Sequence, residues 1–219
     1  MRSVKITALL LALILMFTLT SCEKDREYDE AEVLRATADL IERAKPINEI
    51  FYGKGLSFTE EGAIGAYKPA TPASLTRYGI STIDDLKALT RSVYSSKTSE
   101  GIFAAVLSPT YSGDSIVNYA RYYQAVDDDG NPTTIMVRSN YEHFGSTNMV
   151  YHDGMTVKDV EGEVIIVSVP VTLTRESDGK VKNTTIDVKL IEEADGWRLC
   201  KTTYVVYTES TDEYDEMNK

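Results

Sequence analysis

The sequence predicts an α+β fold in which two to three N-terminal helices pack on a curved antiparallel sheet of five to six strands. Apolar residues recur at helical spacing in the first half of the 219-residue chain and alternate with polar residues in the second half. Asp-Gly pairs separate several alternating segments, as they do in hairpins. Because the helices and the strands form separate runs along the chain, the pattern favours the α+β class.

Three segments of the first half have helical spacing. From residue 29 to about 44, apolar residues recur every three or four positions, and Pro46 then stops the helix, kinks it or opens a second one. The segment Thr82-Ile-Asp-Asp85 resembles a capping box with Asp in place of Glu, and we expect the helix that it starts to reach Ser96. A shorter helix is predicted over 99–107.

The second half of the chain predicts strands. Residues 116–126 and 133–143 flank the turn-forming cluster DDDGNP and predict a hairpin. Pro170 cannot donate a backbone hydrogen bond, so we expect it at a bulge or on an unpaired edge of its strand. Three clear strands and a weaker fourth one are predicted over residues 163–175, 181–193, 197–207 and 149–157.

The N-terminus has the order of a secretory signal. Two basic residues precede an almost unbroken apolar run over 8–19, which is too short to span a bilayer, since a transmembrane helix needs about 20 residues. The next residues, Leu19-Thr20-Ser21-Cys22, resemble a bacterial lipobox at every position. The resemblance implies that residues 1–21 are removed and that the Cys22 thiol carries a diacylglycerol with acyl chains such as palmitate. An ordinary cleaved signal with an incidental cysteine is the alternative.

The predicted mature chain has three parts. The lipidated cysteine and an acidic tether cover 22–32, a single α+β domain covers 33–208, and an acidic disordered tail covers 209–219. The tether is either a solvated spacer or a signal like those that sort some Gram-negative lipoproteins to the outer face of the cell. Removal of the signal peptide takes away two basic residues and no acidic one, so the formal charge falls from −11 to −13. Such a charge argues against nucleic acid and anionic lipid headgroups as partners.

The last third of the chain resembles a known fold family. The run Glu-x-Ala-Asp-Gly-Trp197-Arg-Leu follows a long predicted strand, as in the final hairpin of nuclear-transport-factor-two-like domains, and the resemblance covers roughly 160–207. It implies a cone-shaped α+β domain, and such domains often hold a ligand in the concave face of the sheet.

A second resemblance concerns the order of the segments. The segments STIDDLKALTRSVYSS, SEGIFAAVL, EVIIVSVPVTL and TTIDVKLIEEADGWRL follow one another as in exported inhibitors of cell-wall DL-endopeptidases. Those inhibitors have no catalytic centre and block the cleft of the peptidase. The resemblance implies a protein partner in the cell envelope, but it transfers no individual inhibitory residue to this chain.

The sequence contains no catalytic or metal-binding motif. A nucleophile elbow, a P-loop and a dinucleotide-binding glycine fingerprint are all missing, so no cofactor is implied. Asp127, Asp129 and Asn131 alternate as in an EF-hand loop, but the sixth position is Pro132 and the twelfth is Arg138. A plain hairpin turn is therefore favoured over a calcium site.

Two histidines and one cysteine could still take part in chemistry. His143 and His152 are nine residues apart, a spacing that matches no helical metal motif, so surface or turn positions are favoured. Cys200 has basic neighbours that could lower its pKa, but a strand position without a histidine partner favours a structural thiol.

Tyrosine is unusually frequent, with 14 residues. Alternation along the predicted strand 116–126 places Tyr119, Arg121 and Tyr123 on one face, and Tyr141 and His143 of the next strand are expected near them. Aromatic groups around a few polar ones are typical of a small-molecule site, so these five residues are the candidate ligand pocket. The ordinary preference of half-exposed strands for tyrosine is the alternative.

The segment 53–80 is the candidate surface for a protein partner. It has five glycines, two prolines and no clear period, and unstructured loops of this length are uncommon and often functional. Its aromatic residues Phe58, Tyr67 and Tyr78 are the candidate partner contacts.

Together these patterns predict a lipid-anchored, extracytoplasmic and non-enzymatic binding module that contacts a cell-envelope protein and could inhibit a cell-wall peptidase. The alternative is a small-ligand carrier or a cone-fold enzyme with its pocket in the concave face of the sheet. A deep pocket that holds Arg121 or His143 beside tyrosines would favour the alternative. A filled concave face with exposed aromatic residues on the 53–80 loop would favour the binding module.

Overall fold

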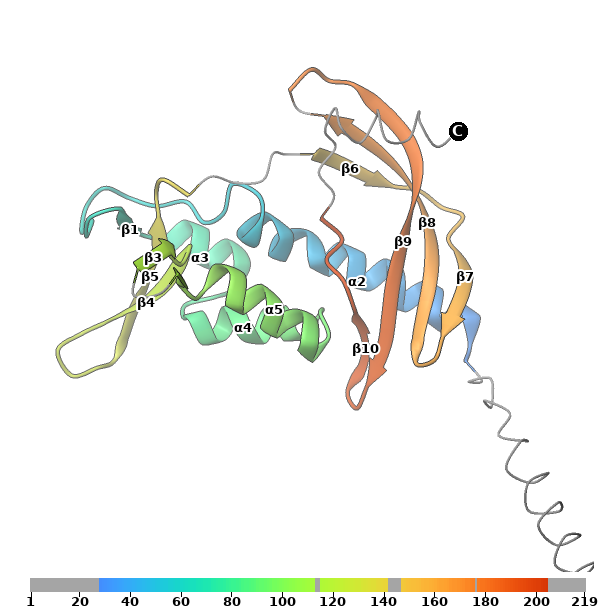
Figure 1. Ribbon diagram of the computed structural model, residues 1–219, viewed down its shortest axis with the longest axis horizontal. Helices are drawn as coiled ribbons and strands as arrows, with labels where there is room; N and C mark the ends of the chain where they lie inside the picture. Colours follow the sequence, from blue (N-terminus) through green and yellow to red (C-terminus); the bar gives the residue numbers. More distant parts are fainter. Residues whose placement is uncertain (1–27, 113–114, 142–146, 176, 205–219) are drawn as a thin grey trace, which may run out of the picture.

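The structure is a computed structural model that describes residues 28–112, 115–141, 147–175 and 177–204. In these residues the chain forms four helices, α2 to α5, and ten strands (Figure 1). The predicted α+β class is confirmed, because the helices precede a curled five-stranded antiparallel sheet, which packs on the longest of them. A three-stranded and a two-stranded sheet lie at the opposite end of the molecule.

Helix α2 (Glu30–Phe51) connects the two ends of the molecule (Figure 1). It begins after Asp29, whose side chain accepts hydrogen bonds from the backbone N–H groups of Ala31 and Glu32. The helix does not end near residue 44 as predicted but continues through Pro46. Its 22 residues give it a length of about 33 Å, enough to reach across the whole core.

The folded part of the chain starts earlier than the predicted domain boundary between residues 32 and 33. Tyr28 packs against the core, and Asp29 caps the first helix. Acidic residues expected in a tether, Glu30 and Glu32, form the first turn of α2 instead. Negative charge there complements the positive end of the helix dipole.

The other helices cluster beside the C-terminal half of α2 (Figure 1). Helix α4 (Ile83–Arg91) has the predicted capping box, because Thr82 accepts from the N–H of Asp85 at 3.1 Å and Asp85 accepts from the N–H of Thr82 at 2.8 Å. The helix ends before the predicted Ser96 because helix α5 (Ser96–Val106) starts there.

Helix α3 (Pro72–Tyr78) was not predicted, since it lies inside the segment 53–80. The hydroxyl of Thr71 accepts a hydrogen bond from the N–H of Ser74, and Pro72 occupies the first helical turn. Gly79 ends the helix in a left-handed conformation with φ of 64°. Part of the expected loop is therefore a short capped helix.

The large sheet has the strand order β10-β9-β8-β6, and β7 also pairs with β8. Its longest strands, β8 (Val164–Arg175) and β9 (Val181–Glu193), match the predictions closely. The weak strand predicted around 149–157 is two strands joined by a turn, and the last predicted strand is shorter than expected. These are β6 (Thr147–Tyr151), β7 (Thr156–Glu161) and β10 (Gly196–Leu199).

Pro170 occupies a gap in the pairing of β8. Strand β6 ends opposite Val171, and β7 begins opposite Ser168. The carbonyl of Pro170 accepts a hydrogen bond from the N–H of His152, in the turn between the two strands, at 3.0 Å. Because the N and C=O groups of one strand residue point to the same side, the missing N–H faces this turn, which fits the predicted unpaired edge.

The hairpin predicted around DDDGNP is present but does not join the large sheet. Strands β4 (Tyr122–Val126) and β5 (Pro132–Arg138) pair with each other, and β1 (Tyr67–Pro69) extends them into a three-stranded sheet. Strands β2 (Thr110–Ser112) and β3 (Ser115–Asn118) form a separate pair. Residues 119–121 lie outside the strands, so the predicted strand 116–126 is interrupted.

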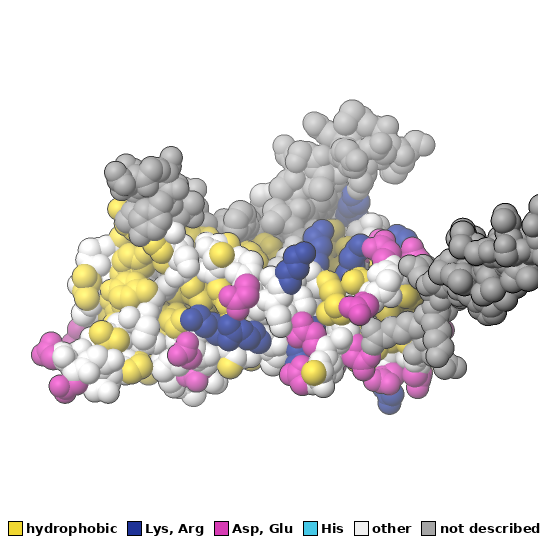
Figure 2. Space-filling model, turned by 60° about the horizontal axis from the view of Figure 1, so that its bottom comes forward, with side chains coloured by type: hydrophobic (Ala, Val, Ile, Leu, Met, Phe, Trp, Pro, Cys, Tyr) yellow, Lys and Arg dark blue, Asp and Glu magenta, His cyan; other side chains and the backbone are white. Residues whose placement is uncertain are grey.

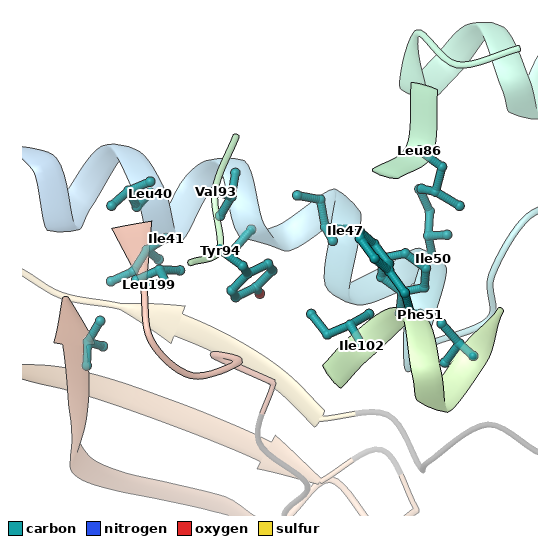
Figure 3. Close-up of a cluster of buried hydrophobic side chains, with 14 of the residues drawn as sticks. Leu40, Ile41, Ile47, Ile50, Phe51, Leu86, Val93, Tyr94, Ile102 and Leu199 are labelled. Carbon is teal, nitrogen blue, oxygen red and sulfur yellow. The ribbon is translucent and has the colours of Figure 1, made fainter. Parts of the chain in front are cut away.

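The core is continuous from one sheet to the other along α2. Figure 3 shows Leu40 and Ile41 close to Leu199 of β10, whereas Ile47, Ile50 and Phe51 face the side of Leu86 and Ile102. All of these side chains are at most 3% exposed. Among the described residues, no helix has the length and apolar character that crossing a membrane requires.

Candidate functional site

The structure brings only part of the predicted ligand pocket together. The guanidinium of Arg121 lies over the ring of Tyr141, 4.6 Å from the ring centroid. Arg121 is 3% exposed, and its Nη2 donates a hydrogen bond to the carbonyl oxygen of Gly53 at 2.7 Å. His143 lies outside the described residues.

A close-fitting turn holds Arg121 in place. Gly55 has a φ of 79°, and a Cβ atom at this position would lie 2.5 Å from Nη2 of Arg121 and 2.4 Å from the hydroxyl oxygen of Tyr122. That hydroxyl donates to the carbonyl of Ile50 and accepts from the N–H of Leu56. Arg121 and Tyr122 therefore fasten the turn that follows α2, where a cation also complements the negative end of the helix dipole.

Arg121 is buried with part of its hydrogen-bonding capacity unused. Its Nε and Nη1 atoms have no acceptor among the described residues. The rings of Tyr141 and Tyr122, at 4.6 and 5.4 Å from the guanidinium carbon, supply cation–π stabilisation in place of a carboxylate.

The side chains of Tyr123 and Tyr119 contact residues other than Arg121. Tyr123 packs edge-on against Tyr67, with ring centroids 4.8 Å apart. Tyr119 is 48% exposed, and the guanidinium of Arg138 lies 5.2 Å from its ring centroid. The predicted common face of the three residues does not form because the strand is interrupted at 119–121, where the N–H of Arg121 donates to the carbonyl of Val106 at 2.7 Å.

The concave face of the large sheet is filled by side chains. Alternate residues of β8 face inward and are at most 5% exposed, and they belong to the same hydrophobic cluster as the inner face of α2. The inward residues of β8 are Ile165, Val167, Val169, Val171 and Leu173. Among the described residues, helix α2 therefore occupies the position that a ligand would take in the concave face of a cone-shaped fold.

The candidate partner contacts differ in how far they project from the surface. Phe58 is 39% exposed, with Nζ of Lys68 5.1 Å from its ring centroid. Tyr67 and Tyr78 are half-buried, and the hydroxyl of Tyr67 donates to the carbonyl of Ala120 at 2.6 Å. Tyr67 and Tyr78 thus contribute to the packing of the 53–80 segment as well as to its surface.

Exposed apolar side chains gather at the end of the molecule that carries the three-stranded sheet (Figure 2). Ile64, which the sequence analysis missed, is 64% exposed and pairs through its backbone with Tyr67. Tyr67 lies opposite Arg138 in the sheet, and Arg138 stacks on Tyr119. We call Phe58, Ile64 and Tyr119, with the half-buried Tyr67, the end surface.

Two grooves are present on the described surface. The β9 groove, about 520 Å³ in volume, is lined by residues 185–189 and 201–204 with Lys158 and Ser168. The α4–α5 groove, about 410 Å³, lies between these helices and β4 and includes Lys87, Phe103 and Tyr123. Arg121 lines neither of them.

The residues considered for metal or nucleophilic chemistry make contacts that stabilise the fold. Asp127 accepts hydrogen bonds from the N–H groups of Asp129 and Asn131, and these bonds, led by those from Asn131, lower the pKa of its carboxyl. Such bonds are those of a tight turn, as predicted. No group of three potential metal ligands occurs among the described residues.

The surroundings of Cys200 disfavour a reactive thiolate, and His152 lies at the surface. Burial, followed by the nearby Glu193 carboxylate, raises the pKa of the Cys200 thiol. A raised pKa disfavours the reactive thiolate and agrees with the structural reading of this residue. His152 is exposed, and its Nε2 lies 2.7 Å from the hydroxyl oxygen of Thr172.

Comparison with known proteins adds no family assignment. No protein-family model matches the sequence, and a comparison with curated proteins gives no match.

The β9 groove was missed by sequence reasoning. Residues 197–207 have the alternation of one long strand, but β10 ends at Leu199 and residues 201–204 run beside β9 without regular structure. The chain leaves the sheet where Thr203 bonds helix α2. The hydroxyl of Thr203 accepts a hydrogen bond from Asn48 at 2.9 Å. A contact between residues 155 positions apart leaves no local signal in the sequence.

Proposed function

We propose that this protein is a lipid-anchored binding module of the cell envelope that contacts another envelope protein and does not catalyse a reaction. The observation that carries the proposal is the contrast between the filled concave face of the large sheet and the exposed end surface. A carrier or a cone-fold enzyme needs an accessible cavity in that face. A protein-binding module needs exposed aromatic and aliphatic side chains instead.

The lipobox supports the anchor. Cys22 precedes the helix cap Asp29 by seven residues, and a chain of that length reaches at most about 25 Å when extended. Two acyl chains on Cys22 would hold the module stably at a membrane surface. The domain would therefore work within a short distance of the lipid headgroups. The formal charge of the predicted mature chain, −11 less the two basic residues of the signal peptide, or −13, would keep anionic headgroups from adhering to it directly.

The end surface supports a protein as the partner. Phe58, Ile64 and Tyr119 are 39%, 64% and 48% exposed, and charged groups such as Lys68 and Arg138 lie directly beside them. Apolar and aromatic anchors inside a polar rim are the usual anatomy of a protein interface. The similarity in segment order to exported DL-endopeptidase inhibitors suggests that a cell-wall peptidase is the partner.

The test uses residues 23–219, the predicted mature chain without its lipidated cysteine, as bait for envelope extract. A double variant, Phe58→Ser with Ile64→Ser, is compared with the original chain and with Val150→Ser, a control that removes another exposed side chain, 48% accessible, from β6. We expect the double variant to lose a captured protein that the control retains. Identical captured proteins for all three would overturn the role of the end surface.

A second measurement addresses the class of the partner. The mature chain is added to a purified cell-wall DL-endopeptidase, and the rate of peptide cleavage is recorded. Inhibition that the double variant lacks would support the peptidase as partner, whereas an unchanged rate would remove this class from the proposal.

A further inference from the structure

Among the described residues, the first half of β9 has no partner strand along one of its two edges. Strand β10 pairs with β9 only from Glu193 to Leu190, and the N–H of Cys200 then donates to the carbonyl of Lys189 at 2.8 Å. From residue 181 to 188, β9 has no strand on this side among the described residues. The other side of the same stretch is fully paired with β8.

Two hydrogen bonds show which backbone groups face the open edge. The carbonyl of Pro170 points away from β9, toward His152, and Pro170 lies opposite Thr185. The backbone groups of Thr185 therefore point away from β8, and those of Lys189 do so as well, because they bond Cys200. By alternation, Thr185 and Asp187 both present an N–H and a C=O group to the open edge.

The open edge forms one wall of the β9 groove. Residues 201–204 form the other wall and contact α2 and the residue that follows it. Thr203 accepts the hydrogen bond from Asn48, and the ring of Tyr204 packs on Tyr52 with centroids 5.4 Å apart. The groove is thus a slot between a sheet edge and a fixed segment.

The side chains of the slot differ between its two faces. Lys158, Lys189 and Lys201 line it, and two of these lysines have acidic partners. Lys158 is paired to Asp187 at 2.6 Å, and Lys189 is paired to Glu161 at 3.0 Å. Lys201 has no acidic partner among the described residues, so the slot has a local excess of one positive charge although the formal charge of the whole chain is −11. The other face of β9 contributes the apolar side chains of Ile186 and Val188.

We propose that the open edge of β9 binds an extended segment of a partner protein, by strand addition, and that acidic and apolar side chains alternate in this segment. An added strand would bond the backbone groups of Thr185 and Asp187. Its acidic side chains would face the lysines, and its apolar ones would lie beside Ile186 and Val188, because successive strand residues point to opposite faces. The inference rests on the proposed function for the class of partner but uses a different surface.

The probe is a blocked synthetic peptide in which valine alternates with glutamate, added to the mature chain. Amide hydrogen exchange is measured by NMR with the peptide, with a counterpart that carries lysine for glutamate, and with one that has a central proline. We expect the acidic peptide to slow exchange of the Thr185 and Asp187 amides by about tenfold at saturation, which corresponds to about one hydrogen bond of net stabilisation. No protection by the acidic peptide, or equal protection by all three, would overturn the proposal.

Three variants test whether the peptide binds in the slot. Thr185→Pro removes an N–H that faces the open edge without touching the pairing with β8, and proline is tolerated on strand edges. Lys201→Glu reverses one charge of the slot, and Arg35→Glu makes the same charge change on an exposed residue of α2 outside it. We expect the first two to weaken the peptide Kd about tenfold and about fivefold, and the control to leave it unchanged. Equal effects of Lys201→Glu and Arg35→Glu would overturn the proposal even if Thr185→Pro fails to fold.

The proposal would also be overturned if the slot is filled by the C-terminal segment or by a second copy of the chain instead of a partner segment. If the Thr185 and Asp187 amides are already protected without peptide and lose protection when the chain is ended at residue 204, the C-terminal segment fills the slot. Protection that depends on protein concentration would assign the slot to a second copy of the chain. Loss of peptide binding alone, with capture still dependent on Phe58 and Ile64, would leave the proposed function standing.

Discussion

Tyr94 donates its hydroxyl to Oδ1 of Asn48 at a distance of 2.6 Å, inside the hydrophobic core. The amide nitrogen of the same Asn48 donates to the hydroxyl of Thr203 at 2.9 Å. Burial raises the pKa of the Tyr94 hydroxyl well above its usual value, so it stays a donor. Helix α2, the link between α4 and α5, and the chain after β10 therefore meet at one buried polar cluster.

Removal of this hydroxyl should destabilise the protein. We expect Tyr94→Phe to lower the free energy of unfolding by about 1–3 kcal/mol, because Oδ1 of Asn48 is left without its donor in a buried site. Urea unfolding followed by circular dichroism measures the change. Tyr119→Phe, at a residue 48% exposed, is the matched control and should shift the free energy by less than about 0.5 kcal/mol. Equal shifts would contradict the role of the cluster.

The turn after α2 predicts a difference between two glycines. Gly55 and Gly65 both have positive φ, 79° and 59°, but a Cβ at Gly55 would collide with Arg121 and Tyr122, whereas no heavy atom lies within 4 Å of one at Gly65. Alanine costs about 1–2 kcal/mol of strain at either position, and overpacking at Gly55 adds about 1–3 kcal/mol. Thermal unfolding of Gly55→Ala and Gly65→Ala measures the difference, and equal stabilities would show that Arg121 can move aside.

Pro170 tests the backbone alternation in the large sheet. Pro170→Val should change the free energy of unfolding by less than about 1 kcal/mol, since no hydrogen bond of the β8 ladder is missing at this position. Val169→Pro, one residue earlier, removes an N–H that points to β9 and should prevent folding or destabilise by about 3 kcal/mol or more. If both variants behaved alike in urea unfolding, the alternation that also defines the open edge of β9 would be wrong.

Stability should fall in alkaline solution. Burial raises the pKa of Tyr122 to about 12, whereas a tyrosine in the unfolded chain ionises near 10. The stabilising contribution is therefore complete below about pH 10 and is lost as the pH rises to about 12, with a size of about 2–3 kcal/mol. Urea unfolding at a series of pH values should show this decline, and Tyr122→Phe should make it shallower. An unchanged slope in the variant would argue against burial of the hydroxyl.

The two cysteines of the chain provide a matched test of the anchor. Cells that express the full chain are labelled with a palmitate analogue, and the envelope and soluble fractions are compared. We expect Cys22→Ala to lose the label and to leave the membrane fraction, whereas Cys200→Ala should keep both properties. Retention of the label by Cys22→Ala would contradict the lipobox interpretation.

The features that the sequence predicted correctly depend on neighbouring residues. The capping box at Thr82 and Asp85 needs a spacing of three residues, and the long strands β8 and β9 need only alternation. The features that it missed depend on distant partners. Residues 119–121 leave the strand where Arg121 bonds Val106 and Gly53, and the chain leaves β9 after Cys200 where Thr203 bonds Asn48.

The sequence predicted which residues belong to the candidate site better than it predicted how they are arranged. Arg121 and Tyr141 do meet, but Arg121 is buried against the turn at Gly53. The assumption that one strand ran through Tyr119 and Tyr123 placed them on a common face, and tertiary contacts of α5 and β5 interrupted that strand. The sequence did identify the segment of the end surface, through Phe58, but the exposure of Ile64 required the fold.

The long helix that crosses the core also determines how the module would respond to mechanical load. If the protein is anchored through Cys22 as proposed, a pull along the axis of α2 would enter the fold at Asp29, the N-terminal cap of that helix. Leu40 and Ile41 pack on the large sheet side and Ile50 on the opposite side (Figure 3), so the force is shared by both ends of the core at once. Under such a load the packing at both ends of α2 would have to break together, so the strands of one sheet would not separate one after another.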